Sequence, residues 1–151
     1  MHINRSRCPI NHSVELLGDK WSLLVLRDIA MLENRTFRAL LRGSQEGISP
    51  AVLSTKLRGL VDLGFIDRAE VSRGKQGRFT LTDKGVDVVP LLFELARLGS
   101  VMNPTTEVTA PGVEQLYGNS AGIEAFTHAV RERERELRRL PVNVDRDVRE
   151  L

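Results

Sequence analysis

The feature that most constrains the fold is a helix start at Ser49, where a serine is followed directly by a proline. Serine before the first turn can accept a hydrogen bond from a free backbone amide, and proline in the first turn loses no hydrogen bond. Leu53, Leu57 and Leu60 follow at helical spacing, which predicts a narrow buried face. The opposite face carries small or polar side chains and one arginine, Arg58. The sequence therefore predicts a firmly capped helix with one side open to solvent.

The segments around this helix add a short helix before it and a hairpin after it. Thr36 predicts the cap of a helix over residues 37–42, and a polar turn then leads to Ser49. Residues 65–71 and 78–82 have the composition of two strands, and the basic segment between them has two glycines that suit a turn. Helix, turn, helix and hairpin is the order of a winged helix-turn-helix. That fold lays its second helix in the DNA major groove and its hairpin, the wing, on the neighbouring backbone.

Helical spacing also predicts elements outside this unit. The expected helices cover residues 9–17, 20–31, 83–99 and 120–140. Pro90 lies well inside the third of these helices and is expected to bend it rather than end it. Residues 131–139 alternate glutamate and arginine, which indicates a solvated helix with pairs such as Glu134 with Arg138.

The fold class predicted is mainly α with a small β-hairpin wing (α+β): a dimeric winged helix-turn-helix with an additional C-terminal helix. Residues 1–103 are expected to form the DNA-binding domain with its dimerisation helices. Residues 104–151 are expected to form a linker and an amphipathic helix with a frayed end. The helix at 20–31 is apolar around most of its circumference, so it must lie at the domain centre or meet a second subunit.

The net charge of +2 is distributed unevenly along the 151 residues. Between Arg35 and Arg78 the chain has nine basic residues against four acidic ones. Local positive charge is what binding to a polyanion requires. We therefore interpret the open face of the helix after Ser49 as a surface that reads DNA bases, and the surrounding cations as phosphate ligands. The predicted base contacts are Ser49, Ser54, Thr55 and Arg58, and the predicted phosphate contacts are Arg38, Arg42, Lys56, Arg73, Lys75 and Arg78.

Other functional classes have little support in the sequence. The three histidines are scattered without metal-ligand spacing, and Gly74-Lys75 lacks the frame of a phosphate-binding loop. We therefore expect no enzyme activity, no cofactor and no metal. No apolar run approaches the roughly 18 residues of a membrane span, and the first residues lack the apolar centre of a signal peptide. A cytoplasmic location is expected.

A winged helix used only for protein–protein contact is the alternative function. Such a module exposes an apolar patch where the polar face is predicted here. A salt titration of binding to random duplex DNA separates the two functions, because strong salt dependence is expected only for the DNA binder.

Several motifs match a known family in combination. They are Cys8-Pro9-Ile10, Leu17-Gly18-Asp19-Lys20-Trp21, Phe37-Arg38-Ala39-Leu40, Gly47-Ile48-Ser49-Pro50, the run from Leu53 to Leu60, and Leu81-Thr82-Asp83-Lys84-Gly85. On these residues the chain resembles the HxlR family of bacterial transcriptional regulators. The resemblance implies a dimeric winged helix-turn-helix that binds double-stranded DNA, and a two-fold dimer in turn predicts a pseudo-palindromic operator. The wing differs from the family pattern, since its tip is shorter and more basic than the usual proline-rich one.

The resemblance also implies a dimer interface and a sensor. In the family the first helix and the C-terminal helices form the dimer contact, which implies an interface of Ile10, Val14, Leu17, Trp21, Phe93 and Phe126. Cys8 is the only cysteine, so an internal disulfide is excluded. It precedes the first helix, whose N-terminus favours a thiolate, and some regulators of this type sense oxidants or electrophiles through a cysteine in this position. A thiol-reactive or small-molecule effector is therefore a hypothesis, against the alternative of a small apolar residue beneath the partner subunit.

Overall fold

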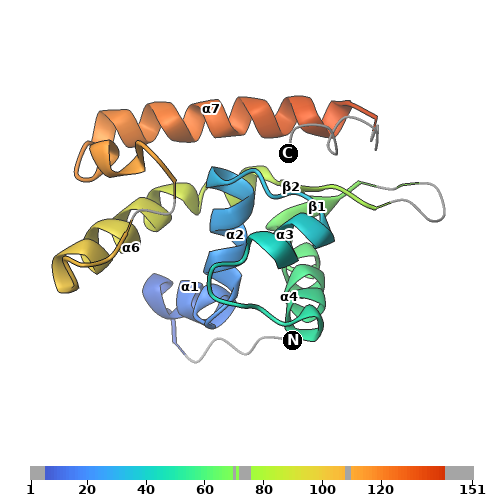
Figure 1. Ribbon diagram of the computed structural model, residues 1–151, viewed down its shortest axis with the longest axis horizontal. Coiled ribbons are helices and arrows are strands. Elements are labelled where there is room, and N and C mark those ends of the chain that lie inside the picture. The colour runs from blue at the N-terminus through green and yellow to red at the C-terminus, as the bar shows by residue number, and fades with distance from the viewer. Residues whose placement is uncertain (1–5, 70, 72–75, 108–109, 142–151) are drawn as a thin grey trace.

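The structure is a computed structural model that describes residues 6–69, 71, 76–107 and 110–141. In these residues the backbone forms seven α-helices, one 3₁₀ helix and one pair of antiparallel strands (Figure 1). In chain order the elements are α1 (Pro9–Leu17), α2 (Ser22–Met31), α3 (Phe37–Gly43), α4 (Pro50–Asp62), β1 (Ile66–Arg68), β2 (Phe79–Leu81), α5 (Asp83–Val86), α6 (Val89–Met102), η1 (Val113–Leu116) and α7 (Ser120–Arg139). This order confirms the predicted winged helix-turn-helix, in which α3 and α4 are the helix pair and the two strands form the wing.

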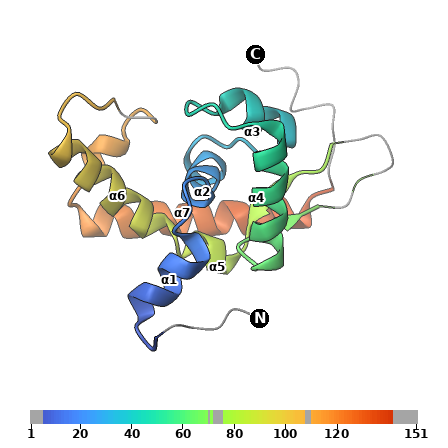
Figure 2. The same cartoon turned by 90° about the horizontal axis from the view of Figure 1, so that it is seen from below.

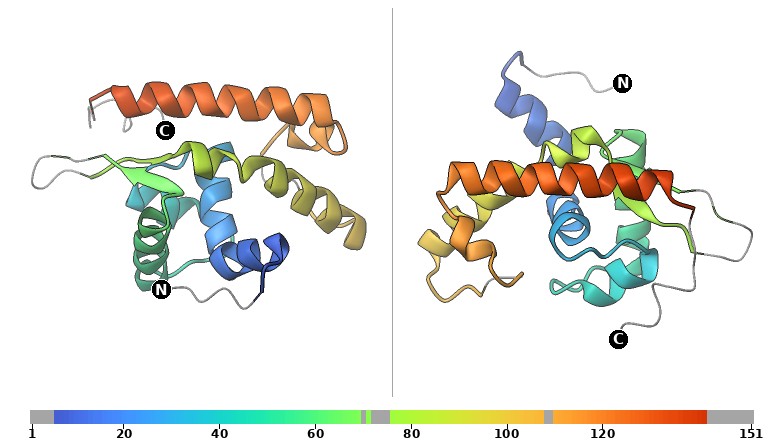
Figure 3. Two further views of the ribbon diagram at one scale, coloured as in Figure 1. Left: turned by 180° about the vertical axis from the view of Figure 1, so that it is seen from behind. Right: turned by 90° about the horizontal axis from the view of Figure 1, so that it is seen from above.

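The elements are arranged around α2, which lies at the centre of the molecule (Figures 1 and 2). The hairpin extends on one side of α2, and α1 and α6 extend on the other. α7 crosses over β2 and α5 (Figure 3). Because β1 contacts α4 and β2 contacts α7, the hairpin lies between the second helix of the helix pair and the C-terminal helix.

The two strands are shorter than the sequence predicts. Ile66 pairs with Leu81 and Arg68 pairs with Phe79. One further backbone hydrogen bond, from the amide of Phe79 to the carbonyl oxygen of Arg35, attaches β2 to the segment that enters α3. The wing is thus joined at its root to the first helix of the helix pair.

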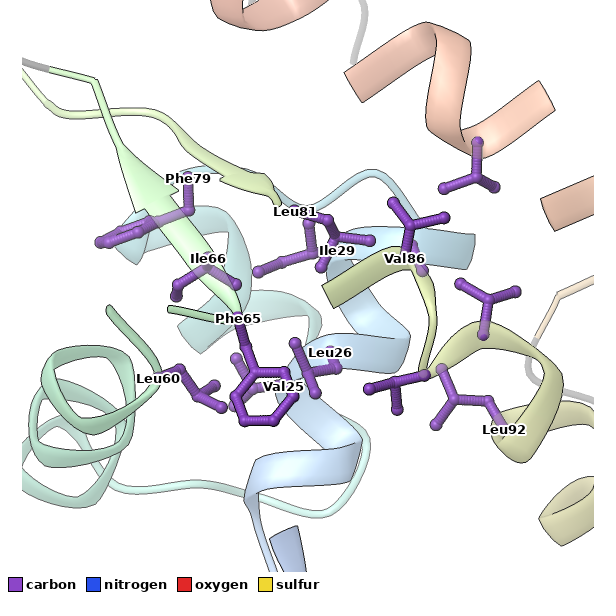
Figure 4. Close-up of a cluster of buried hydrophobic side chains, with 14 of the residues drawn as sticks. Val25, Leu26, Ile29, Leu60, Phe65, Ile66, Phe79, Leu81, Val86 and Leu92 are labelled. Atoms are coloured by element: carbon purple, nitrogen blue, oxygen red, sulfur yellow. The ribbon is translucent and has the colours of Figure 1, made fainter. Parts of the chain in front are cut away.

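The hydrophobic core is built on α2. Leu26 and Ile29 are fully buried and point into the space that α4, the hairpin and α5 enclose (Figure 4). Leu60 of α4 and Leu81 of β2 enter the same cluster. This central position explains why α2 is apolar around most of its circumference.

Side-chain caps fix the helix starts that the sequence predicts. Ser49, Thr36 and Thr82 each accept a hydrogen bond from the amide three residues later, at 3.3, 3.1 and 3.1 Å. Asp19 accepts hydrogen bonds from the amides two and three residues later, and the helix that follows begins at Ser22. These caps determine where α3 and α4 begin and therefore how their faces are directed.

The helix expected over residues 83–99 is in fact two helices, so the prediction of a bend at Pro90 is wrong. Pro90 lies in the first turn of α6, where proline is tolerated without a kink. Gly85 in α5 packs closely on the backbone of Phe65, and a Cβ at Gly85 would lie 2.0 Å from that carbonyl oxygen. α5 is thereby held against the hairpin before the chain changes direction. α6 then continues past the expected end, to Met102.

The C-terminal helix is not solvated in the way that its alternating charges predicted. α7 packs on β2 and α5, and Glu134 has no exposed surface. Glu134 binds Arg35 rather than Arg138, and Arg138 donates to the carbonyl oxygen of Leu81. α7 is therefore part of the same packed unit as the winged helix.

Candidate nucleic-acid interface

α4 presents its polar face to solvent. Ser54, Thr55 and Arg58 are exposed, and the leucines on the opposite face are buried. The Thr55 hydroxyl donates to the carbonyl oxygen of Ala51 at 3.0 Å, which fixes its orientation. The Ser49 hydroxyl oxygen serves as the helix cap and keeps its own proton for another acceptor. The four predicted base contacts therefore lie at the exposed start and along the exposed face of one helix.

A groove of about 470 Å³ lies between α4 and the wing. Ser54 and Arg58 line it from α4, and Arg68 and Gln76 line it from the hairpin side. The guanidinium of Arg68 lies 5.9 Å from the centre of the Phe79 ring, within the range of a cation–π contact. Two arginines from two different elements thus face one groove, an arrangement that suits a polyanion running between helix and wing.

Arg68 was not among the predicted contacts. The sequence shows it as one of nine basic residues between positions 35 and 78, with nothing to distinguish it from the others. Its role depends on which side of the hairpin is turned toward α4, and the short strands do not reveal that side by alternation. The structure shows this side directly, because Arg68 pairs with Phe79 across the hairpin.

The predicted phosphate contacts next to α4 have two different environments. Arg38 and Arg42 on α3 are exposed. The ammonium of Lys56 instead lies 2.9 Å from the carboxylate of Asp19. Burial raises the pKa of Asp19, but hydrogen bonds from Ser22, Lys56 and backbone amides outweigh it and lower that pKa to about 2. Lys56 therefore ties α4 to the corner between α1 and α2 in the free protein.

The prediction that Arg78 contacts phosphate is contradicted by its position. Arg78 is only 9% exposed, and its guanidinium donates to the carbonyl oxygens of Leu137 and Leu140, the latter at 3.0 Å. These carbonyls belong to the end of α7, where free carbonyl oxygens and the helix dipole attract a cation. Two other predicted phosphate contacts, Arg73 and Lys75, lie outside the residues that the structure describes.

Arg27 holds the turn before α4 against the domain centre. Its two terminal nitrogens donate to the two carboxylate oxygens of Glu46 at 2.7 and 2.9 Å, and its Nε donates to Asp28. The hydrogen bond from Arg27 lowers the pKa of Glu46, whereas burial raises the pKa of Asp28. Through this contact α2 fixes the segment that leads into α4.

The predicted dimer contacts divide into exposed and buried residues. Ile10 and Val14 on α1 are 72% and 54% exposed, so they are available to a partner. Leu17 and Phe93 are buried within the chain itself, and the prediction for these two is wrong. Phe93 packs edge-on against Phe126, with ring centres 5.2 Å apart, which joins α6 to α7. The Phe93 side chain is therefore used for packing within the chain and is not available to a second subunit.

α6 carries an exposed apolar stripe that the sequence analysis did not assign. Leu91, Leu95, Leu98 and Met102 follow one another at intervals of four, three and four residues, and each is more than 40% exposed. The stripe was not predicted because the sequence suggested a bend at Pro90 and the end of the helix at Gly99, so residues 91–102 were not expected to form one straight helix. The remaining predicted contacts, Trp21 and Phe126, are partly buried and pack against the core.

Cys8 is exposed at the N-cap of α1, two residues before Ile10.

Within the described ranges no group of histidine, cysteine, aspartate and glutamate side chains is arranged to hold a metal ion. Over the same ranges no helix combines the length and the apolar character that crossing a membrane requires.

Two bacterial proteins are similar in sequence to this chain. An uncharacterized HTH-type transcriptional regulator of Synechocystis sp. is 36% identical over 94 residues, which are 62% of this chain and 68% of the relative. An uncharacterized HTH-type transcriptional regulator of Mycobacterium tuberculosis is 34% identical over 99 residues, which are 65% of this chain and 61% of the relative.

A solved structure and a family model agree with this fold. The crystal structure of PA1607, a candidate transcription factor, matches with a TM-score of 0.60 at 27% identity and covers 70% of this chain and 73% of that chain. The model described as HxlR-like helix-turn-helix matches residues 16–107 and so excludes α7. These proteins are transcriptional regulators rather than enzymes. The chain belongs to the HxlR-like helix-turn-helix family of transcriptional regulators.

Proposed function

We propose that this chain is a sequence-specific DNA-binding regulator that acts as a homodimer in the cytoplasm, where a bacterial chromosome lies. The observation that carries the proposal is the exposed face of α4, where Thr55 and Arg58 lie without aliphatic cover. The major groove of DNA admits an α-helix, and this face has no bulky side chain to hold α4 away from the base edges. Arg58 donates to a guanine, while Ser49 and Ser54 bond to neighbouring base edges.

Phosphate contacts on either side of α4 set its register on the duplex. Arg38 and Arg42 are exposed on α3 and supply these contacts on one side. Arg68 supplies them from the wing, together with the basic tip that the sequence predicts. Lys56 joins the set only when a phosphate replaces Asp19 as its partner.

The exposed stripe on α6, together with Ile10 and Val14 on α1, supports the homodimer. Exposed apolar side chains in water favour association with a second apolar surface. A two-fold dimer places its two α4 helices about 34 Å apart along the DNA, so that each reads one half of a pseudo-palindromic operator.

Replacing Leu95 with glutamate is expected to convert the dimer to a monomer, because a carboxylate in an apolar contact loses its hydration without gaining a partner. Sedimentation equilibrium measures the change. Arg97→Gln is the matched control, since Arg97 is exposed on the same helix but lies off the stripe. A Leu95→Glu protein that sediments as a dimer would place the interface elsewhere.

Selection of bound sequences from a random duplex pool tests DNA binding and its specificity together. The expected result is an enriched inverted repeat, with an affinity that falls steeply as salt increases. The alternative function, a protein–protein module, predicts no enriched sequence and no steep salt dependence, and that result would overturn the proposal.

We further propose that Cys8 responds to thiol-reactive compounds. Its support is the exposed position of the thiol, two residues before the exposed side chain of Ile10 on the surface assigned to the dimer. With one cysteine per chain, oxidation must join two subunits or attach a small thiol, while a quinone attaches by addition. A quinone is expected to lower operator affinity in the wild type and to have no effect on Cys8→Ser. An equal response of the two proteins, or no response in either, would remove the proposal.

A further inference from the structure

Glu134 of α7 occupies the point where the helix pair, the wing and the C-terminal helix meet. Its carboxylate accepts hydrogen bonds from both terminal nitrogens of Arg35, at 2.6 and 2.9 Å, and from the backbone amide of Leu81, at 2.9 Å. The Glu134 side chain is 0% exposed and that of Arg35 is 8% exposed. Arg35 directly precedes the Thr36 cap of α3, and Leu81 is the last residue of β2. One buried carboxylate therefore binds the entrance of the helix pair and the end of the wing strand together.

α7 also holds the other end of β2. The guanidinium of Arg78, the residue before β2, donates to the carbonyl oxygens of Leu137 and Leu140. Arg138 donates in the opposite sense, from α7 to the carbonyl oxygen of Leu81. Both ends of β2 are thus bonded to α7, while β1 on the other side of the hairpin contacts α4.

Ion pairs at the surface also join α7 to α5 and to the residue that follows it. Arg131 lies 2.7 Å from Asp87, and Arg135 lies 3.2 Å from Asp83. The hydrogen bond from Arg135 lowers the pKa of Asp83. Exposed pairs of this kind contribute little to stability and are screened by salt. Removing one partner of the buried Glu134–Arg35 pair is therefore expected to disturb this contact more than removing any of the exposed pairs.

We propose that α7 sets the angle between the wing and α4, with Glu134 as the positioning residue. The proposal rests on DNA binding as proposed above, and it concerns a helix that lies outside the family match at residues 16–107. In the described part of the chain no residue that lines the groove between α4 and the wing comes from α7. Glu134 therefore has no direct place in this groove and acts on it through β2 and through Arg35 at the entrance of α3.

Removal of this carboxylate has a specific physical consequence. In Glu134→Gln, Arg35 keeps a buried positive charge without a counterion, and one carboxamide oxygen replaces the two oxygens that accept hydrogen bonds from Arg35 and from the amide of Leu81. The root of the wing relaxes, and Arg68 moves out of register with the DNA backbone. The base contacts from α4 persist, because α4 is held by the caps, by Arg27 and by its own buried leucines.

The test compares full-length Glu134→Gln with Glu136→Gln, a control on the same helix whose side chain is exposed. In Glu134→Gln the slope of log affinity against log salt is expected to flatten by about one unit for each phosphate that the wing no longer binds, which is about a fivefold decrease in affinity near physiological salt. Discrimination between the cognate duplex and a duplex with one base changed under Arg58 stays as in the wild type. Glu136→Gln keeps the wild-type slope and affinity.

Hydrogen exchange supplies a readout that does not involve DNA. The amides of Phe79 and Leu81 are expected to exchange faster in Glu134→Gln, while those of α4 keep their wild-type rates. A purely structural role predicts a lower melting temperature and a smaller active fraction, with an unchanged salt slope for the folded protein. That outcome would overturn the proposal, as would unchanged exchange in the hairpin.

A second variant keeps the test valid if Glu134→Gln does not fold. Arg35→Met combined with Glu134→Met removes the buried pair without leaving an unpaired charge, so the double variant is expected to fold. Methionine offers no oxygen to the amide of Leu81, so the double variant should show the same flatter slope and faster hairpin exchange. If wild-type protein shows no salt-dependent binding to DNA, the proposed function fails. If the wild type binds with a steep slope and both variants match it, only the role of α7 fails.

Discussion

Replacing Arg58 with alanine is expected to weaken binding to the cognate operator far more than binding to random duplex DNA. A bidentate arginine–guanine contact contributes about 1–3 kcal/mol of discrimination, or about 5- to 150-fold in relative affinity. Arg58 is exposed on α4 and makes no hydrogen bond to another described residue, so its removal should leave the fold intact. Competition binding with cognate and scrambled duplexes at one salt concentration measures the effect.

Arg38→Ala is the matched control for this measurement. Arg38 is an exposed arginine on the neighbouring helix, α3, and is expected to touch phosphate only. Its loss should lower affinity for both duplexes equally and flatten the salt dependence by about one unit of slope. If Arg58→Ala behaves in the same way as this control, Arg58 does not read a base.

Gly85→Ala is expected to destabilise the protein by about 3 kcal/mol, at the upper end of the range for overpacking. An added Cβ would meet the carbonyl oxygen of Phe65 at 2.0 Å and the side chain of Leu81 at 3.3 Å. The first of these atoms belongs to the backbone next to β1 and cannot rotate away. α5 must therefore move off the hairpin, and urea denaturation should show a lower midpoint.

Gly59→Ala provides the opposite expectation within the same protein. Gly59 lies inside α4, and a Cβ built there meets no atom within 4 Å. Alanine is favoured over glycine in a helix by about 1 kcal/mol, so this variant should be more stable than the wild type. Equal midpoints for the two variants would show that α5 packs less closely on the hairpin than the structure indicates.

The helix starts and the order of elements were predictable because local rules determine them. Ser49, Thr36 and Thr82 each cap a helix with a bond that spans three residues, so a short stretch of sequence contains both partners. The polar face of α4 was predictable for the same reason, since its leucines repeat at helical spacing.

The role of α7 was not predictable from local patterns. Glu134 and Arg138 are spaced for an ion pair along one helix, and that local reading is reasonable. The partner that Glu134 takes is Arg35, 99 residues away, because the tertiary fold buries this face of α7 against β2. Arg78 is similar: its charge suggests phosphate, and only the position of the end of α7 shows that carbonyl oxygens bind it.

The chain ends α5 at Val86 and begins α6 at Val89, and this break depends on the contact between Gly85 and Phe65 as well as on Pro90. Pro90 is compatible with a bent helix or with the first turn of a new one, and both readings follow from the same rule. The close approach of Gly85 to Phe65 favours the second reading. Once α6 is a separate helix, its face with Leu91 and Leu95 is turned outward, and the stripe assigned to the dimer becomes visible.

The ion pair between Asp19 and Lys56 joins the corner that follows α1 to α4. α1 has nine residues, so it is a rod about 14 Å long, with Cys8 at one end and Asp19 just beyond the other. Lys56 lies on α4, the helix proposed to read DNA, and its ammonium is 2.9 Å from the carboxylate of Asp19. A tilt of this short rod would therefore move Asp19 relative to Lys56 and change an electrostatic contact with α4.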